Sequence, residues 1–177
     1  MFDKKYAVII ADGSEEIEIT VPTDILRRSG ATCELISVNC LTVIGSHGIK
    51  ITADDKLIAE VDYSAYDGVI VPGGMDGAKA IAACKQATDF IYGVYNRQKL
   101  VAAICAAPAI VLSEIPQICD RTITCYPDKD LISRIKYCRY RKSEVVSSAN
   151  LITGNGPLAV FKFSMVICRH EHLPINI

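Results

Sequence analysis

Short apolar runs of strand length alternate with segments of helical period, and this alternation constrains the fold of the chain more than any other feature. Four runs are almost continuously hydrophobic: residues 6–11, 33–38, 67–72 and 100–104. Strands that are covered on both faces have this composition. Helical patterns lie at about 15–29, 76–83, 87–97 and 107–114. The order predicts an α/β fold with a mostly parallel sheet and helices on both of its faces.

The rest of the chain departs from this alternation. Residues 41–52, LTVIGSHGIKIT, contain two short β-rich runs around a Gly-Ser-His-Gly centre, which is typical of a β-hairpin and is expected to project from the sheet edge. After Pro116 the pattern weakens. It predicts short strands near 121–125, 144–148 and 150–153, and a helix over about 158–169. Because the chain has no repeat or convincing linker, we expect one domain over residues 1–177.

The charge of the chain is almost balanced, with 19 basic and 20 acidic residues, so it provides no global field for nucleic acid or anionic membranes. The segment RIKYCRYRK, residues 134–142, mixes basic and aromatic residues as nucleic-acid surfaces do, but the overall charge favours a solvated face. We therefore expect neither nucleic acid nor a membrane as a partner.

The N-terminus and the cysteines favour a cytosolic protein. The first apolar run spans only about five residues, which is too short for a signal-peptide core or a membrane span. The eight cysteines are scattered and never form a C-x-x-C pair. We therefore expect reduced thiols, with neither a disulfide framework nor a zinc site.

The stretch LVAAICAAPAIVL, residues 100–112, places Cys105 where a buried strand runs into a helix. Small residues follow the cysteine and Pro108 suits the first turn of a helix, so the geometry of a nucleophile elbow is expected. The positive end of a helix can lower the pKa of a cysteine from about 8.5 to roughly 3.5–7.5, whereas apolar neighbours raise it. From the pattern alone, Cys105 is explained equally well as a buried packing residue or as a nucleophile.

An acid-rich segment, DGSEEIEI, follows the first strand. Asp12 and Glu15 have the spacing of a capping box, and Glu15 and Glu16 suit the positive end of a helix, so a solvated first turn explains them. The apolar stripe of this helix consists of Ile17, Val21 and Ile25. Glu18 lies nearer this stripe than the other acids, so we expect it to be partly buried, with a raised pKa, and able to act as an acid or a base.

The third strand is followed by a glycine turn, PGGMDGAKA, residues 72–80. Backbone amides in such a turn can approach a ligand and stabilise an oxyanion, which makes Gly73 and Gly74 candidate site residues. A phosphate loop is the alternative, but the spacing is G-G-x-x-G rather than G-x-G-x-x-G.

Three stretches, ADGSEEIEITVPTDILRRSG, YDGVIVPGGMDGAKA and VAAICAAPAIVL, closely resemble the ThiJ/PfpI superfamily in sequence, order and spacing, and in particular its DJ-one branch. The later GNGPLAVFKFSMVI is similar to the GPGT loop and following helix of that family. The resemblance covers roughly residues 5–169. It is far more specific than any single motif above.

The resemblance implies a flavodoxin-like three-layer sandwich in a single ThiJ/PfpI-like (class I glutamine-amidotransferase-like) domain. It also implies a homodimer that needs no cofactor or metal. Cys105 matches the reactive cysteine of the family and Glu18 its protonated partner. Gly73 and Gly74 match the amides of the glycine turn, which would hold an oxyanion together with the Ala106 amide.

The resemblance implies two alternative functions. The first is a glyoxalase III or deglycase that acts on a small aldehyde such as methylglyoxal, or on glycated amino groups, and protects against oxidative stress. The second is a redox sensor or chaperone that responds to oxidation of Cys105 to a sulfinic acid instead of turning over a substrate. Some relatives carry an older label in thiazole monophosphate biosynthesis.

Three positions depart from the pattern of the family. Ala106 follows Cys105 where many members of the wider superfamily have a histidine, which argues against a Cys-His triad peptidase. Tyr126 stands where the nearer branch often has a histidine, so slower turnover is expected. His47 stands where the hairpin of relatives carries an arginine. We regard Tyr126, His47 and Arg28 as auxiliary candidates outside the catalytic pair.

Overall fold

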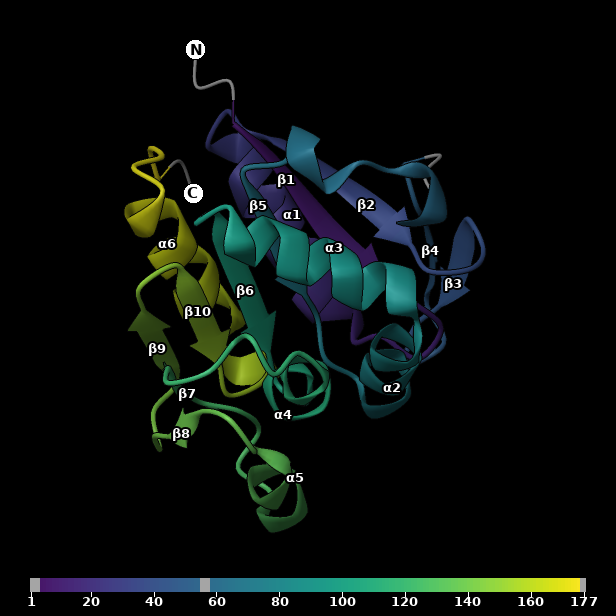
Figure 1. The fold of residues 1–177 in the computed structure, drawn as a ribbon. Coiled ribbons are helices and arrows are strands. Elements are labelled where there is room, and N and C mark those ends of the chain that lie inside the picture. The colour runs from purple at the N-terminus through teal and green to yellow at the C-terminus, as the bar shows by residue number, and fades with distance from the viewer. Residues whose placement is uncertain (1–3, 55–57, 176–177) are drawn as a thin grey trace.

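The computed structural model describes residues 4–54 and 58–175 and has a six-stranded sheet at its centre (Figure 1). The strands, in spatial order, are β2 (Thr32–Ser37), β1 (Lys5–Ile10), β5 (Gly68–Val71), β6 (Leu100–Ile104), β10 (Leu151–Gly154) and β9 (Val145–Ser148). All neighbouring pairs are parallel except β10 and β9. Counted along the chain, the parallel strands have the flavodoxin-like order 2-1-3-4-5. The predicted flavodoxin-like α/β fold is confirmed.

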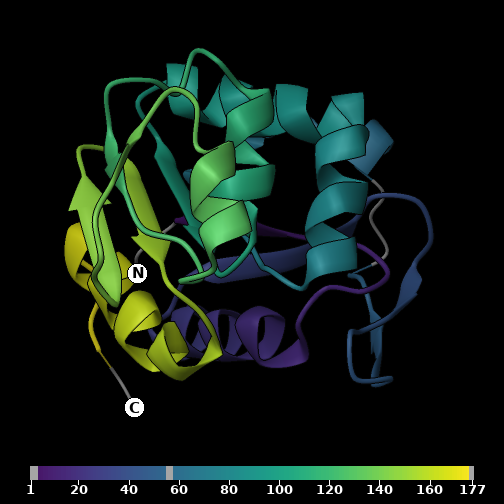
Figure 2. The same cartoon turned by 90° about the horizontal axis from the view of Figure 1, so that it is seen from below.

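Helices cover both faces of this sheet (Figure 2). One face carries α1 (Glu16–Arg28) and α6 (Val160–His170), and the other carries α2 (Met75–Ala83), α3 (Lys85–Asn96) and α4 (Ala107–Ile110). The side chains of β1 alternate between the two layers: Val8 and Ile10 pack with α1 and α6, whereas Ala7 and Ile9 pack with α2, α3 and α4. Two covered faces explain why the strands are apolar almost without interruption.

The predicted hairpin is present and extends beyond the helical layers (Figure 2). It consists of β3 (Thr42–Ile44) and β4 (Lys50–Thr52). The predicted capping box was wrong, because Asp12 serves the hairpin: its Oδ1 accepts a hydrogen bond from the Ile44 amide at 2.8 Å. The N-cap residue of α1 is Glu15, whose side chain makes no capping hydrogen bond.

The chain after β6 differs most from the prediction. The single helix expected over 107–114 is divided into α4 and a 3-10 turn, η3 (Leu112–Glu114). Between β7 (Thr122–Ile123) and β8 (Arg139–Tyr140) lies a short helix that was not predicted, α5 (Lys129–Arg134). Asp128 caps this helix, since its side chain accepts hydrogen bonds from the amides of Asp130 and Leu131.

The described residues also contain three further 3-10 turns: η1 (Ile58–Glu60), η2 (Tyr63–Ala65) and η4 (Pro157–Ala159). Across residues 4–54 and 58–175, no helix is both long and apolar enough to cross a membrane.

Candidate active site

The candidate site lies at the carboxyl ends of three adjacent strands. The connection from β1 leads to β2 on one side, and the connection from β5 leads to β6 on the other, so the strand order switches between β1 and β5. Open α/β sheets bind ligands at this switch point. Glu18 lies in α1 after β1, Gly73 and Gly74 follow β5, and Cys105 follows β6. The topology therefore brings these four residues to one edge of the sheet.

Cys105 occupies a sharp corner between β6 and α4. Its backbone has φ +64°, in the left-handed region that non-glycine residues seldom adopt, at a cost on the order of 1–3 kcal/mol. Two hydrogen bonds hold this conformation: the Cys105 amide donates to the Gly154 carbonyl at 2.9 Å, and the Tyr126 amide donates to the Cys105 carbonyl at 2.8 Å. The side chain is half-buried. The corner has the geometry expected of a nucleophile elbow.

Glu18 is buried more deeply than the sequence predicted. It has no exposed surface, whereas Ile17, placed in the apolar stripe by the sequence, is 43% exposed. Of the predicted stripe, Ile25 is buried, and the buried face of α1 also runs through Glu18, Ile19, Pro22 and Leu26. Glu18 Oε2 accepts a hydrogen bond from the Gly73 amide at 2.8 Å. Its Oε1 is buried and has no hydrogen-bond partner within the described residues.

Glu18 and Cys105 influence each other's ionisation. Burial raises the pKa of the Glu18 carboxyl to about 7, against the opposing hydrogen bonds from the Gly73 amide and the Cys105 thiol. Burial also raises the pKa of the Cys105 thiol to about 12, and the negative charge of Glu18 adds to the rise. The sequence predicts two opposing effects on the pKa of this thiol: the helix end lowers it and apolar neighbours raise it. Burial prevails over the helix end because α4 spans only four residues.

Protonation of Glu18 removes the negative charge beside the sulfur. The amides of Gly74 and Ala106 point toward Cys105 and favour its thiolate. The thiolate therefore forms most readily beside a neutral Glu18, so the two groups titrate as a coupled pair.

The glycine turn has no room for a side chain at Gly73 or Gly74. A Cβ atom on Gly73 would lie 2.5 Å from the Cβ of Cys105 and 2.7 Å from Glu18 Oε2. Gly74 has φ +78°, which favours glycine. The sequence assigned the amides of both glycines to an oxyanion, but the Gly73 amide already binds Glu18. In this arrangement Gly73 positions the carboxyl, and Gly74 and Ala106 face the sulfur.

Tyr126 borders an open hollow that Cys105 does not line. The hollow has a volume of about 380 Å³, and Tyr126 lines it together with Pro127, Glu144, Asn155, Gly156, Pro157, Leu158 and Ala159. The Tyr126 side chain is 46% exposed. Because its amide binds the Cys105 carbonyl, the auxiliary candidate Tyr126 does adjoin the cysteine.

His47 is bound to the start of α1, and its partner is Glu16. Glu16 Oε1 accepts hydrogen bonds from the amides of His47 at 2.7 Å and Ile49 at 3.3 Å. Glu16 Oε2 lies 3.2 Å from His47 Nδ1. The expectation that Glu16 is solvated was wrong, because the hairpin folds over it and leaves it only 4% exposed.

The Glu16 carboxyl is held in its charged form. Burial alone would raise its pKa, but hydrogen bonds from its own amide and from His47 and Ile49 lower the pKa to about 2. The carboxyl groups of Glu16 and Glu15 raise the pKa of the exposed His47 in turn. Glu16 therefore fastens the hairpin tip to α1, a role that no local sequence signal indicates.

The same residues form a cluster with metal-type ligand atoms. Oxygen and nitrogen atoms of Glu15, Glu16 and His47 lie within 4.8 Å of one another. The cluster is explained without an ion, because Ser46 Oγ donates to Glu15 Oε2 at 2.8 Å and Glu16 binds the hairpin amides.

Arg28 lies in the last turn of α1, ten residues after Glu18 and about 15 Å farther along the helix axis. Its Nε forms an ion pair with Asp24 Oδ2 at 2.7 Å. It lines a groove with Thr20, Val21, Asp24, Ile25 and Phe161. Within the described chain, Arg28 thus belongs to the α1 and α6 face rather than to the surroundings of Cys105.

Comparisons with known proteins show the family to which the chain belongs. The DJ-1/PfpI family model matches residues 4–170. Protein DJ-1alpha of Drosophila melanogaster is 33% identical over 166 residues, which cover 93% of this chain and 76% of that protein. The chain also matches Protein DJ-1 homolog B of Arabidopsis thaliana at 32% identity, but spans only 36% of its length.

Solved structures show the same fold. The crystal structure of Drosophila melanogaster DJ-1beta matches with a TM-score of 0.89 and 30% identity, over 96% of this chain and 90% of that chain. An oxidised form of Toxoplasma gondii DJ-1 matches with a TM-score of 0.87 and 31% identity, over 96% of this chain and 91% of that chain.

The structure belongs to a class of α/β proteins with a flavodoxin-like sandwich. In this class a cysteine lies at a strand end beside a buried carboxyl group. The chain belongs to the DJ-1/PfpI family. The resemblance stated from the sequence is confirmed.

Proposed function

We propose that the chain is a cofactor-independent cysteine enzyme of the glyoxalase III or deglycase type, which acts on methylglyoxal or on glycated amino groups. The observation that carries the proposal is the pairing of Cys105 with a fully buried Glu18 whose pKa is raised to about 7. A carboxyl with this pKa can both donate and accept a proton at neutral pH. A cysteine used only for packing needs no such partner.

The reaction begins when Glu18, as a carboxylate, takes the proton of the Cys105 thiol, which leaves a thiolate beside a neutral carboxyl group. The sulfur adds to the aldehyde carbon of methylglyoxal, and the electron pair of the carbonyl bond moves to its oxygen. The amides of Gly74 and Ala106, which point toward Cys105, stabilise this oxyanion. Glu18 then protonates the oxygen, which gives a hemithioacetal and leaves Glu18 as a carboxylate.

Glu18 next moves a proton between the two carbons. The carboxylate removes the proton from the hemithioacetal carbon and delivers it to the adjacent keto carbon, while the hydroxyl proton passes to the former keto oxygen. The product is a lactoyl thioester on Cys105. Water hydrolyses the thioester and releases lactate. Because one carbon is oxidised as the other is reduced, the reaction needs no external electron acceptor.

Lactate formation from methylglyoxal tests this proposal in the wild-type protein and two variants. We expect Cys105→Ser to abolish lactate formation and Glu18→Gln to lower it by about 10²–10⁴-fold, the usual contribution of a general acid-base group. The half-buried Cys84, at the junction of α2 and α3, supplies the control. Cys84→Ser should keep full activity. Equal lactate formation in wild type and Cys105→Ser would refute the proposal.

A redox sensor is the second candidate function. It is supported by the oxidised form of the related Toxoplasma gondii DJ-1 and by the half-buried position of Cys105, which leaves part of its side chain open to an oxidant. In this function, peroxide converts Cys105 to a sulfinic acid without turnover. Peptide mapping after mild peroxide should then find two added oxygens on Cys105 before any other cysteine forms a sulfinic acid. Sulfinic acid spread evenly over the eight cysteines would count against it.

We propose further that the protein acts as a homodimer in the cytosol. The groove between α1 and α6 is bordered by Phe161, which is 56% exposed, and this large apolar surface suits a contact with a second copy. All eight cysteines are free thiols, which suits a reducing compartment.

A further inference from the structure

Two cysteines outside the candidate active site lie at the two ends of one chain segment. This segment, residues 119–138, follows η3, includes β7 and α5, and ends at the start of β8. Backbone hydrogen bonds join the two ends: the Asp120 amide donates to the Tyr137 carbonyl at 3.0 Å, and the Arg139 amide donates to the Arg121 carbonyl at 2.8 Å. Cys119 directly precedes one end of this pairing, and Cys138 lies within the other.

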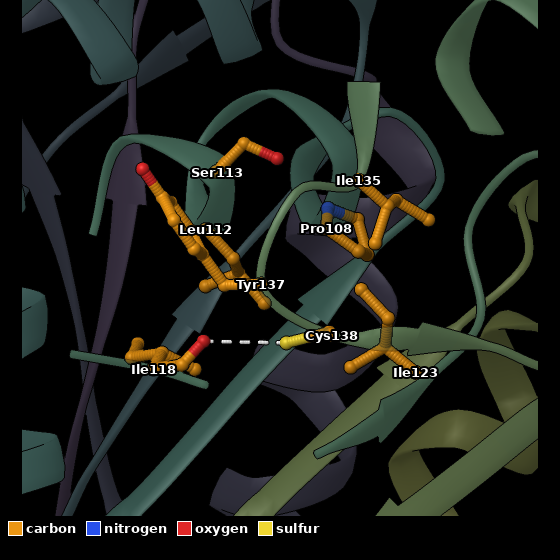
Figure 3. Close-up of a pocket in the computed structure, with 8 residues that line it drawn as sticks. All are labelled: Pro108, Leu112, Ser113, Ile118, Ile123, Ile135, Tyr137 and Cys138. Carbon is orange, nitrogen blue, oxygen red and sulfur yellow. Dashed lines mark hydrogen bonds between the residues drawn. The ribbon is translucent and has the colours of Figure 1, made fainter. Parts of the chain in front are cut away.

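The Cys138 sulfur already lies against the backbone of Cys119. The Cys138 thiol donates to the Ile118 carbonyl at 3.2 Å (Figure 3). That carbonyl belongs to the peptide bond that joins Ile118 to Cys119. The two thiols also interact electrostatically: burial raises the pKa of Cys138, the Arg121 amide opposes the rise, and a negative charge on Cys119 adds to it.

The exposure of the two thiols suits successive steps of one reaction. Cys119 is exposed and open to an oxidant, whereas Cys138 is half-buried. The Cys138 side chain packs against apolar residues that include Pro108, Leu112 and Ile135 (Figure 3), so Cys119 is the thiol of the pair that an oxidant reaches first.

The other cysteines outside the candidate active site are placed differently. Cys33, Cys125 and Cys168 are buried. Cys40 lies beside the hairpin, where its thiol donates to the Thr42 carbonyl, and Cys84 lies at the junction of α2 and α3. In Figure 1 the hairpin and the junction of α2 and α3 lie toward the opposite edge of the sheet from β7 and β8.

We propose that Cys119 and Cys138 form a reversible dithiol–disulfide pair that is oxidised by hydroperoxides. The Cys119 thiolate attacks a peroxide oxygen, the O–O bond breaks, and Cys119 becomes a sulfenic acid as water or an alcohol leaves. The Cys138 thiol then attacks the Cys119 sulfur, the S–S bond forms, and the hydroxyl leaves as water with the Cys138 proton. Two electrons pass from the two thiols to one peroxide. An external thiol then reduces the disulfide and restores both thiols.

The disulfide closes the segment that carries α5 and Tyr126, whose amide donates to the Cys105 carbonyl. The pair therefore restrains the chain next to the candidate site when peroxide is present. This inference rests on the geometry of residues 118–139 and does not depend on the proposed enzymatic function.

Peptide mapping of the intact, full-length protein tests the inference. The protein is treated with a limited amount of hydrogen peroxide, its remaining thiols are alkylated, and it is digested without reductant. We expect one cross-linked product that joins the peptides of Cys119 and Cys138, within a chain of monomer mass that has lost two hydrogen atoms. Dithiothreitol should restore both thiols.

Single variants separate the two steps. Cys138→Ser should lose the cross-link and accumulate a sulfenic acid on Cys119, which dimedone labels, whereas Cys119→Ser should lose both products. Cys84→Ser, which removes another accessible thiol, should keep the cross-link. The inference is wrong if oxidised Cys119 stays unlinked to Cys138 in the wild type, or if either residue pairs with Cys40, Cys84 or a second chain instead.

Discussion

Glu18 and Cys105 cannot both be ionised at neutral pH, because each lies in the field of the other and burial disfavours both charges. The pair therefore keeps at least one proton at neutral pH, and this proton can move between the sulfur and the carboxyl. The Gly73 amide orients the carboxyl, and the amides of Gly74 and Ala106 favour negative charge on the sulfur. This arrangement prepares a nucleophile together with the acid that it needs.

The raised pKa of Glu18 predicts how stability depends on pH. Its pKa is about 7 in the folded protein, compared with an ordinary value of 4.5, so the folded state binds more protons than the unfolded state between these values. The stabilisation from protonated Glu18 is complete below about pH 4.5 and is lost as the pH rises through 7. Glu18→Gln removes this dependence.

Chemical denaturation of both proteins at pH 5 and pH 8 measures the effect. We expect the free energy of unfolding of wild type, minus that of Glu18→Gln, to fall by up to about 3 kcal/mol between the two pH values. Subtracting the variant cancels the other titrating groups. A difference that does not change with pH would contradict the raised pKa.

Single residues differ in how far the sequence could predict them. Cys105 and Glu18 follow from local signals, a strand end and a position on a helix. The apolar stripe predicted for this helix was nevertheless centred on Ile17, Val21 and Ile25, because the helical period alone does not specify which neighbouring elements pack against the helix. The burial of Glu16 was missed for a related reason: it depends on a hairpin that returns about thirty residues later.

At the scale of elements, the hairpin and α1 form one unit. Asp12 binds the Ile44 amide and Glu16 binds the amides of His47 and Ile49, so the first strand and the tip of the hairpin are attached to the chain that leads from β1 into Glu18. The charged Glu16 carboxylate is therefore expected to stabilise the hairpin and the start of α1 together.

Glu16→Gln tests this attachment. The variant loses the charge that strengthens the hydrogen bonds, and we expect the free energy of unfolding at pH 7 to fall by about 1–3 kcal/mol. Because the pKa of Glu16 is lowered to about 2, its stabilisation is present above pH 4.5 and is lost as the pH falls toward 2. The loss relative to wild type should therefore shrink in acid.

Urea denaturation at pH 3 and pH 7 measures these changes. The matched control is Asp24→Asn, a carboxylate of the same helix whose side chain is 62% exposed. We expect this control to change stability by less than about 1 kcal/mol. If Glu16→Gln is no more costly than Asp24→Asn, the hairpin is not held by Glu16.

Elements were predicted best where their periodic pattern is long. The strands and the helices α1, α3 and α6 each bury a continuous face, so their ranges were close to those expected. The helix α5 has only six residues, too few to show a period, and its cap at Asp128 was the one local sign of it. The apolar run after Cys105 was read as one helix because composition does not distinguish α4 from the 3-10 turn that follows.

At the scale of the whole molecule, the two helical layers have different roles. The layer of α2, α3 and α4 is covered in part by α5 and carries the corner at Cys105, whereas the layer of α1 and α6 presents an open groove with an exposed Phe161. The strand alternation was enough to predict the layered fold. It carries no information on which layer a second copy would cover.

Sedimentation measurements test the proposed homodimer. We expect wild type to sediment as a dimer at micromolar concentration and Phe161→Asp to sediment as a folded monomer, because a charge in the apolar contact is costly to bury. Tyr137→Asp, which changes another exposed aromatic residue outside the groove, should remain a dimer. A monomeric wild type, or a dimeric Phe161→Asp, would exclude this face as the interface.

The most direct test of the central claim is to trap the intermediate on Cys105. Wild-type protein is mixed with excess methylglyoxal, quenched in acid during turnover and mapped by mass spectrometry. The account predicts a lactoyl thioester on Cys105 that disappears as the substrate is consumed, and no such thioester in Glu18→Gln. Lactate formation without a Cys105 adduct, or an adduct that persists equally on all cysteines, would contradict it.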